Sequence, residues 1–201
     1  MRIEWRISAP PHWQAEALLF FVPEKTPQPP EGLVQWIRQG AQWLAQSPAL
    51  RDFQGKIQQV AVFYDPGDGP VPRVLCCGLG PPEDFHPERL RMAAAAGLRK
   101  CRELRLKEAA LPLSAFAGLP CEAAVALEEA VLGAVTGLHQ YDALKTRDVE
   151  PTSFPETLCL LAEREPEPAV RQAPFLAEAV SSGILLARDL TVAPANEITP
   201  S

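Results

Sequence analysis

The segment that most resembles a phosphate-binding loop is Gly78-Leu79-Gly80, which follows an apolar run and precedes a helical pattern. A dinucleotide-binding loop needs a third glycine and a helix that begins at once, so that backbone N–H groups face the phosphates. Here Pro81 and Pro82 follow instead, and proline has no backbone N–H to donate. We therefore interpret this segment as a turn at the end of a strand.

Residues that could bind a metal ion are scattered along the chain. The three histidines, His12, His86 and His139, are far apart and form no His-Glu-x-x-His motif, so each is interpreted as a surface or capping residue. The cysteines are odd in number and contain no Cys-x-x-Cys pair; they are Cys76, Cys77, Cys101, Cys121 and Cys159. This pattern indicates buried free thiols rather than a zinc site. We predict no metal-binding or cofactor-binding residue in this chain.

Candidate catalytic groups have equally simple structural interpretations. Glu128-Glu129 lies outside the apolar stripe of a helical pattern, which indicates a solvated face rather than a carboxylate pair. Ser181-Ser182 falls within a helix, without a nucleophile elbow or a nearby base. Tyr141-Asp142 and Lys145 follow a helix and are interpreted as loop or interface residues. We predict no catalytic residue.

One predicted helix, residues 87–107, is rich in basic side chains. It carries seven of the 19 lysines and arginines of the chain, namely Arg89, Arg91, Arg99, Lys100, Arg102, Arg105 and Lys107. Such a cluster could contact nucleic acid. Several of these residues stand near the C-terminal end of the helix, however, where positive charge complements the helix dipole. The dipole explanation is the simpler one.

The composition is that of an ordinary globular protein with many loops. Of the 201 residues, 47% are apolar and 22% are charged, whereas the 22 prolines are about twice the usual share of ~5%. The net charge of −6 disfavours binding to nucleic acid or to an anionic membrane. No apolar run approaches the ~18 residues of a membrane span, and the N-terminus lacks the apolar core of a signal peptide. We expect a cytoplasmic protein without a membrane partner.

Several elements could position these residues. Alternation at Ile3, Trp5 and Ile7 predicts a half-buried strand near a sheet edge. Continuous apolar runs predict buried strands at Leu18–Val22, Val60–Phe63, Val74–Cys77 and Leu158–Leu161, which should neighbour one another. A weak strand at Ala109–Leu113 is expected at an edge because of Pro112.

Periodic apolar residues predict four helices. Their approximate ranges are Glu31–Gln46, Pro87–Lys107, Cys121–Leu138 and Pro174–Leu190, with a linker at Glu165–Pro168 before the last one. The last helix should carry an apolar stripe of Leu176, Val180, Ile184 and Ala187. Alternating strands and helices predict an α/β fold, with a mostly parallel sheet covered by helices on both faces.

Three segments resemble the leucyl (cytosol) aminopeptidase family. Ala187-Arg188-Asp189-Leu190, a short spacer, Pro194-Ala195-Asn196 and then Thr199-Pro200 are similar to the segment that leads into the catalytic domain of that family. Val74–Arg99 resembles its strand, Gly-Leu-Gly loop and Arg/Ala-rich helix, and Leu132–Asp148 resembles its glycine-rich helix. These segments follow the order of the family along residues 72–201, whereas residues 1–71 match only in the order of strands.

The resemblance implies a macro-like α/β domain at the N-terminus, followed by a catalytic domain that holds two divalent metal ions, zinc or manganese. The matched tail residues are scaffold in that family, so no catalytic, cofactor-binding or metal residue carries over. We accordingly expect a macro-like domain over residues 1–165, and a linker helix with the truncated start of the catalytic domain over residues 166–201. The family forms hexamers, which implies partners in the chain's own catalytic domain and in further copies.

The resulting hypothesis is a non-catalytic N-terminal domain that supports assembly and active-site access. The parent would be a metallo-exopeptidase that releases N-terminal amino acids from peptides, and the 201-residue chain alone is predicted to be inactive. One alternative is a stand-alone macro-like module that binds a nucleotide or ADP-ribose; it would need an open glycine-rich cradle, which Pro81 and Pro82 disfavour. A second alternative is nucleic-acid contact through the basic helix at 87–107, which would be salt-dependent.

Overall fold

A computed structural model of the chain describes residues 1–25, 31–39, 41–47, 49–67, 69–140 and 155–193. In this part of the chain one sheet holds strands in the order β1-β6-β5-β2-β4-β3. The strands are β1 (Arg2–Ile7), β2 (Leu18–Pro23), β3 (Val60–Tyr64), β4 (Arg73–Gly80), β5 (Glu108–Pro112) and β6 (Thr157–Ala162). All neighbouring pairs are parallel except β3 with β4, which is antiparallel.

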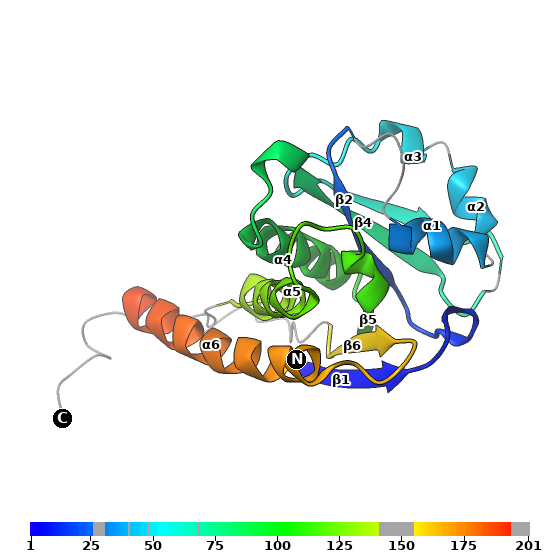
Figure 1. Cartoon of the computed structure of the whole chain (residues 1–201). Helices are drawn as coiled ribbons and strands as arrows, with labels where there is room; N and C mark the ends of the chain where they lie inside the picture. Colours follow the sequence, from blue (N-terminus) through cyan, green and yellow to red (C-terminus); the bar gives the residue numbers. More distant parts are fainter. Residues whose placement is uncertain (26–30, 40, 48, 68, 141–154, 194–201) are drawn as a thin grey trace, which may run out of the picture.

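Helices cover both faces of the sheet (Figure 1). On one face lie α4 (Glu88–Glu103), α5 (Ala123–Gly137) and α6 (Pro168–Val192), with α5 between the other two. On the other side lie α1 (Glu31–Arg38), α2 (Gln42–Ala45) and α3 (Ala49–Asp52). Three 3-10 turns complete the described elements: η1 (Pro10–His12), η2 (Pro82–Asp84) and η3 (Leu113–Phe116). The predicted α/β class, with a mostly parallel sheet, is confirmed.

The strand β2 shows why the central strands have continuous apolar sequences. Phe20 faces α1, where its ring lies 6.1 Å from that of Trp36. Phe21 projects to the opposite face and stacks on Phe116 of η3 at 5.6 Å. Because successive side chains of a strand point to opposite faces, a strand covered by helices on both sides must be apolar at every position.

The order of the strands corrects two of the sequence-based expectations. β5 is a central strand between β6 and β2, not an edge strand, and Pro112 lies at its end, beyond Ala110, where β5 pairs with β2. β3 lies at the edge, with Val60–Val62 half-buried, Phe63 buried and Tyr64 exposed, whereas a fully buried strand is expected from the sequence of Val60–Phe63. The four apolar strands are therefore not all neighbours, since β5 separates β6 from β2. The prediction that β1 lies at an edge is confirmed.

Two predicted helices differ from the observed ones. The helix expected over Glu31–Gln46 is divided into α1 and α2, and Ala41 between them has non-helical dihedrals (φ −92°, ψ 40°). Residues seven positions apart in a straight helix are ~10.5 Å apart along its axis. The break allows the Trp36 and Trp43 rings to meet edge to face, 6.5 Å apart.

The last helix begins at Pro168 rather than near Pro174, so the linker expected at Glu165–Pro168 ends in the first turn of α6. Proline suits the first turn of a helix, where no N–H is needed for an intrahelical bond. Pro174 lies inside the helix and is buried. The sequence analysis places the start of this helix six residues too late, because Pro174, like Pro168, suits the first turn of a helix.

Candidate functional site

Both glycines of the Gly78-Leu79-Gly80 segment use their backbone N–H groups within the protein. The Gly78 N–H donates to the Gln59 carbonyl oxygen at 2.8 Å, and the Gly80 N–H donates to the Gly55 carbonyl oxygen at 2.9 Å. Gly80 has φ +80°, a conformation that glycine adopts without strain. The interpretation as a structural segment rather than a phosphate loop is thus supported, although β4 continues through Gly80.

The position where open α/β sheets usually bind ligands is filled by the protein itself. Such sites lie at the carboxyl ends of neighbouring strands whose connections run in opposite directions, which here are β2 and β5. η3 follows β5 directly, and α1 packs so closely on it that a Cβ on Gly32 would meet the Ser114 carbonyl oxygen. The stacked rings of Phe21 and Phe116 close the crevice from within. A stand-alone nucleotide-binding module is therefore not supported.

The three histidines do not converge on a metal site. His12 and His86 are exposed, as expected. His139 is half-buried, and its Nε2 lies 2.9 Å from Oδ1 of Asp189 on α6. Within the described ranges, no group of three or more His, Cys, Asp and Glu side chains could hold a metal ion. The two divalent ions implied by the resemblance do not fit these residues.

Glu129 is not on a solvated face, which corrects that prediction. Its carboxylate accepts two hydrogen bonds from Arg91 of α4, from Nε at 2.7 Å and from Nη2 at 2.8 Å. These bonds raise the pKa of the Arg91 guanidinium above its ordinary value. The side chain of Glu129 is only 19% exposed, so this bidentate pair joins α4 to α5 and leaves no free carboxylate for acid–base chemistry.

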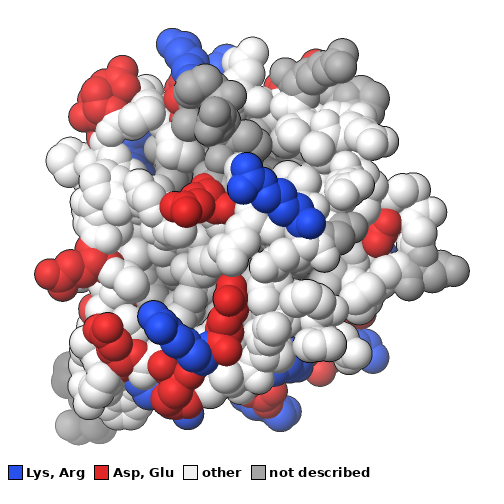
Figure 2. Space-filling model, turned by 45° about the vertical axis from the view of Figure 1, so that its right-hand side comes forward, with Lys and Arg blue, Asp and Glu red and all other residues white. Residues whose placement is uncertain are grey.

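Several basic residues of α4 have partners within the molecule. Arg89 donates to the Leu79 carbonyl oxygen, Arg102 donates to the Leu138 carbonyl oxygen, and Lys100 lies 2.8 Å from Glu103. On the face shown in Figure 2, acidic and basic side chains are interspersed, and neither sign forms a continuous field. A nucleic-acid surface requires such a field. Because Arg89, Lys100 and Arg102 already have partners within the molecule, contact with nucleic acid through this helix is not supported.

The remaining candidates are structural or fall outside the described part. Ser181 and Ser182 donate to the carbonyl oxygens of Ala177 and Glu178, one helical turn earlier, which confirms that they are mid-helix residues. Cys76, Cys77, Cys101 and Cys159 are buried free thiols, as predicted, whereas Cys121 is a free thiol that is only half-buried. Tyr141-Asp142 and Lys145 lie outside the described residues.

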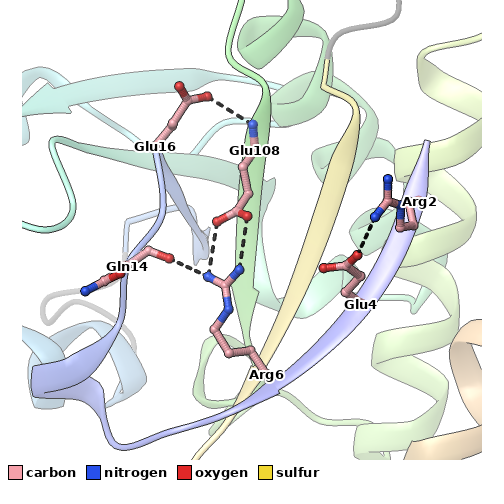
Figure 3. Close-up of polar contacts among 6 residues, drawn as sticks. All are labelled: Arg2, Glu4, Arg6, Gln14, Glu16 and Glu108. Carbon is pink, nitrogen blue, oxygen red and sulfur yellow. Dashed lines mark hydrogen bonds and ion pairs between the residues drawn. The ribbon is translucent and has the colours of Figure 1, made fainter.

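One polar cluster could not be found from the sequence. Arg6 of β1 reaches across the sheet to Glu108 at the start of β5, with N–O distances of 3.2 and 3.1 Å, and also donates to the Gln14 carbonyl oxygen (Figure 3). Glu16 in turn accepts the backbone N–H groups of Lys107 and Glu108. The ionic partners stand 102 residues apart, and no local pattern signals their pairing. The cluster fastens the edge strand and the segment before β2 to β5.

The outer side of α6 is a candidate contact surface, because large apolar side chains are exposed on it. Five large apolar side chains on this side are 47–72% exposed, namely Phe175, Leu176, Val180, Leu186 and Leu190. Val192 is also exposed, but it stands five helical turns after Pro174 and projects in the same direction as that residue. The inward side is formed by Val170, Ala173, Pro174, Ala177 and Ser181, and it packs on α5. We call the exposed side the outer face of α6. Exposed apolar surface of this kind is typical of a contact with another domain or subunit.

Residues 19–148 match the family model described as "Cytosol aminopeptidase family, N-terminal domain". The chain belongs to this family. Among relatives, a probable cytosol aminopeptidase of Syntrophobacter fumaroxidans is 49% identical over 201 residues, which is the whole chain and 40% of the relative. One from Nitratidesulfovibrio vulgaris is 37% identical over 206 residues, again with 40% of the relative covered. The chain thus spans about two fifths of the length of these cytosol aminopeptidases.

Solved structures show the same fold. A tomato leucine aminopeptidase mutant is 23% identical to this cytosol aminopeptidase domain, with a TM-score of 0.77, and the match covers 100% of this chain and 40% of that one. The bottromycin maturation enzyme BotP is 25% identical, with a TM-score of 0.64, and the match covers 92% and 34%. The described residues include no helix that is both long and apolar enough to cross a membrane.

Proposed function

We propose that this chain is the non-catalytic N-terminal part of a metal-dependent aminopeptidase that releases N-terminal amino acids from peptides. In this proposal residues 1–165 form a macro-like domain, and residues 166–201 link it to the catalytic domain. The domain would support assembly and shape access to the active site. The family match and the share of the relatives that it covers support this assignment.

The outer face of α6 is the observation that carries the proposal. A helix that only covered its own domain would be apolar on the side toward α5 and polar on the other. In α6 the side away from α5 is apolar as well, with Phe175 72% exposed and Leu186 61% exposed. We assign this face to contact with the catalytic domain.

Other properties of the whole enzyme follow from the family. The relatives are named as cytosol aminopeptidases, from which we infer a cytoplasmic location for this protein. The two divalent metal ions, zinc or manganese, would be held by the catalytic domain, because the described residues offer no ligand cluster. A hexamer is the proposed assembly, with no role for nucleic acid or membrane.

Light scattering of the 201-residue chain tests the role of the outer face. We expect self-association at micromolar concentrations, because an uncovered apolar face pairs with another copy. Leu186→Glu should give a monomer with an unchanged melting temperature, since this side chain is exposed. Val125→Glu is the matched control, an exposed apolar residue on α5 at 39%, and it should leave the association unchanged.

Ile184→Glu would not serve as the test, although the predicted stripe includes this residue. Ile184 packs against the core at the boundary of the outer face, so a glutamate there would destabilise the fold itself. A wild-type chain that is monomeric up to high concentration, together with a Leu186→Glu variant of the same solubility, would refute the docking role of this face.

A further inference from the structure

A hollow of about 450 Å³ lies between one side of α4, from Arg91 to Arg102, the C-terminal end of α5 and Arg188 of α6, with Gln58 also in its lining. Its volume falls within the range of about 300–1,000 Å³ that is typical of small-ligand sites. Four arginines line it, Arg91, Arg99 and Arg102 from α4 and Arg188 from α6. The hollow is distinct from the outer face of α6 and from the filled crevice at the end of β2.

Three of the four guanidinium groups have partners that account for their positions. Arg91 binds Glu129, as described above. Arg102 and Arg188 each use one Nη1 to donate to carbonyl oxygens at the C-terminal end of α5, those of Leu138 at 3.2 Å and Thr136 at 2.9 Å. These bonds satisfy carbonyl groups that a helix end leaves without partners. The other donors of Arg102 and Arg188 are not used in these contacts.

Arg99 has no such explanation. It lies on the same side of α4 and is half-buried, and within the described ranges it makes no hydrogen bond or close ion pair, although Glu103 one turn later interacts with it electrostatically. A guanidinium carries five N–H donors and stays charged at any physiological pH, so those of Arg99 are available to a ligand in the hollow. This residue indicates that the hollow receives a group that can accept hydrogen bonds.

The donors of the lining define the class of ligand. Arg91 is paired with both Glu129 and Glu88, and Glu103 interacts electrostatically with Arg99 and Arg102. Arg188 has no ion-pair partner in the described part of the chain and donates to the Thr136 carbonyl oxygen through Nη1 alone. The oxygens of a phosphate dianion suit the planar fork of guanidinium donors that Arg99, Arg102 and Arg188 do not use in these contacts.

We propose that the hollow between α4, α5 and α6 binds a small phosphate-class dianion, with Arg99 as the principal ligand and Arg102 and Arg188 as supporting donors. The site is composite, since Arg188 comes from α6 and the other arginines come from α4. A bound dianion would therefore fasten the C-terminal half of α6 to the domain. The inference does not depend on the aminopeptidase assignment.

The test is titration of the 201-residue chain with inorganic phosphate at constant ionic strength, followed by calorimetry and by thermal melting. We expect saturable binding and a rise in melting temperature that follows saturation, because a ligand of the native state stabilises it. Arg99→Gln should weaken binding about tenfold to hundredfold, the effect of one charged hydrogen-bonding group. This variant should fold normally, since Arg99 makes no ion pair or hydrogen bond in the described structure.

Arg38→Gln is the matched control, an exposed arginine of α1 on the other side of the sheet, and it should bind phosphate like the wild type. β-Glycerophosphate distinguishes an organic phosphate monoester, which would then bind more tightly, from free phosphate. Hydrogen exchange should slow within residues 183–190 when phosphate is bound. Absence of saturation, equal affinity in Arg99→Gln, equal loss in Arg38→Gln, or acetate binding as tight as phosphate would overturn the proposal.

Discussion

Helices α4 and α5 approach each other closely where they cross, and this contact depends on Gly133. A Cβ at this position would lie 2.0 Å from the Arg91 carbonyl oxygen of α4. One turn later, a Cβ on Gly137 would lie 2.5 Å from that of Ala95. The two glycines are four residues apart and therefore share one side of α5. We predict that Gly133→Ala destabilises the fold by forcing these helices apart.

Two opposing effects determine how Gly133→Ala changes the free energy of unfolding: helix propensity and overpacking. Alanine favours a helix interior over glycine by about 1 kcal/mol. Overpacking costs about 1–3 kcal/mol in ordinary cases, and this contact is severe because the obstructing atom belongs to the backbone. We therefore expect a net destabilisation of about 1–2 kcal/mol or more. The matched control is Gly183→Ala in α6, where a Cβ would meet nothing within 4 Å, and this variant should gain about 0.5–1 kcal/mol.

Urea unfolding measured by circular dichroism gives the free energy of unfolding of both variants. The dependence of this free energy on urea concentration should be the same as in the wild type. In a chain of this size a change of 1 kcal/mol moves the melting temperature by about 2–4 °C, so the opposite signs should be visible in thermal melts as well. If Gly133→Ala were as stable as the wild type, or if both variants shifted in the same direction, the close α4–α5 packing would be refuted.

Two further predictions concern the thiols and the activity. Burial raises the pKa of Cys76 and of Cys101 to about 12 from an unfolded value of ~8.5. Their contribution to stability is thus constant below pH ~8.5 and declines above it, so the urea midpoint should fall between pH 8.5 and 10. At pH 8 a thiol reagent should modify only the half-buried Cys121 before unfolding, and fast labelling of several cysteines would contradict this. The chain should not hydrolyse leucine-4-nitroanilide with Mn²⁺ or Zn²⁺, and turnover that a chelator abolishes would disprove that.

Much of the fold could be predicted because a strand that is buried on both faces has a continuous apolar sequence. β2 and β4 are apolar at nearly every position, since helices cover both their faces. β1 alternates, because one of its faces is partly open to solvent. β5 was placed wrongly because its sequence is short and ends in Pro112, and only the pairing on both sides shows that it is central.

The contacts between distant residues could not be predicted in the same way. Arg91 and Glu129 are 38 residues apart and Arg6 and Glu108 are 102 apart, so each pair is created by the crossing of elements rather than by local spacing. Glu129 was assigned to a solvated face because it lies outside the apolar stripe of its own helix. That argument assumes that only apolar side chains face a neighbouring helix, and a bidentate ion pair is the exception.

The two sides of α6 differ in the size of their apolar residues. This difference distinguishes the side that packs within the domain from the side available for contact with another domain or subunit. Its inward side presents small residues to α5, among them Ala173, Ala177 and Ser181. Phe175 and Leu186 face outward instead. Full burial of a large apolar side chain contributes about 1.5–3 kcal/mol, much more than burial of alanine. The large apolar side chains of α6 therefore contribute little hydrophobic free energy within this domain, and the proposed contact with a catalytic domain would bury them.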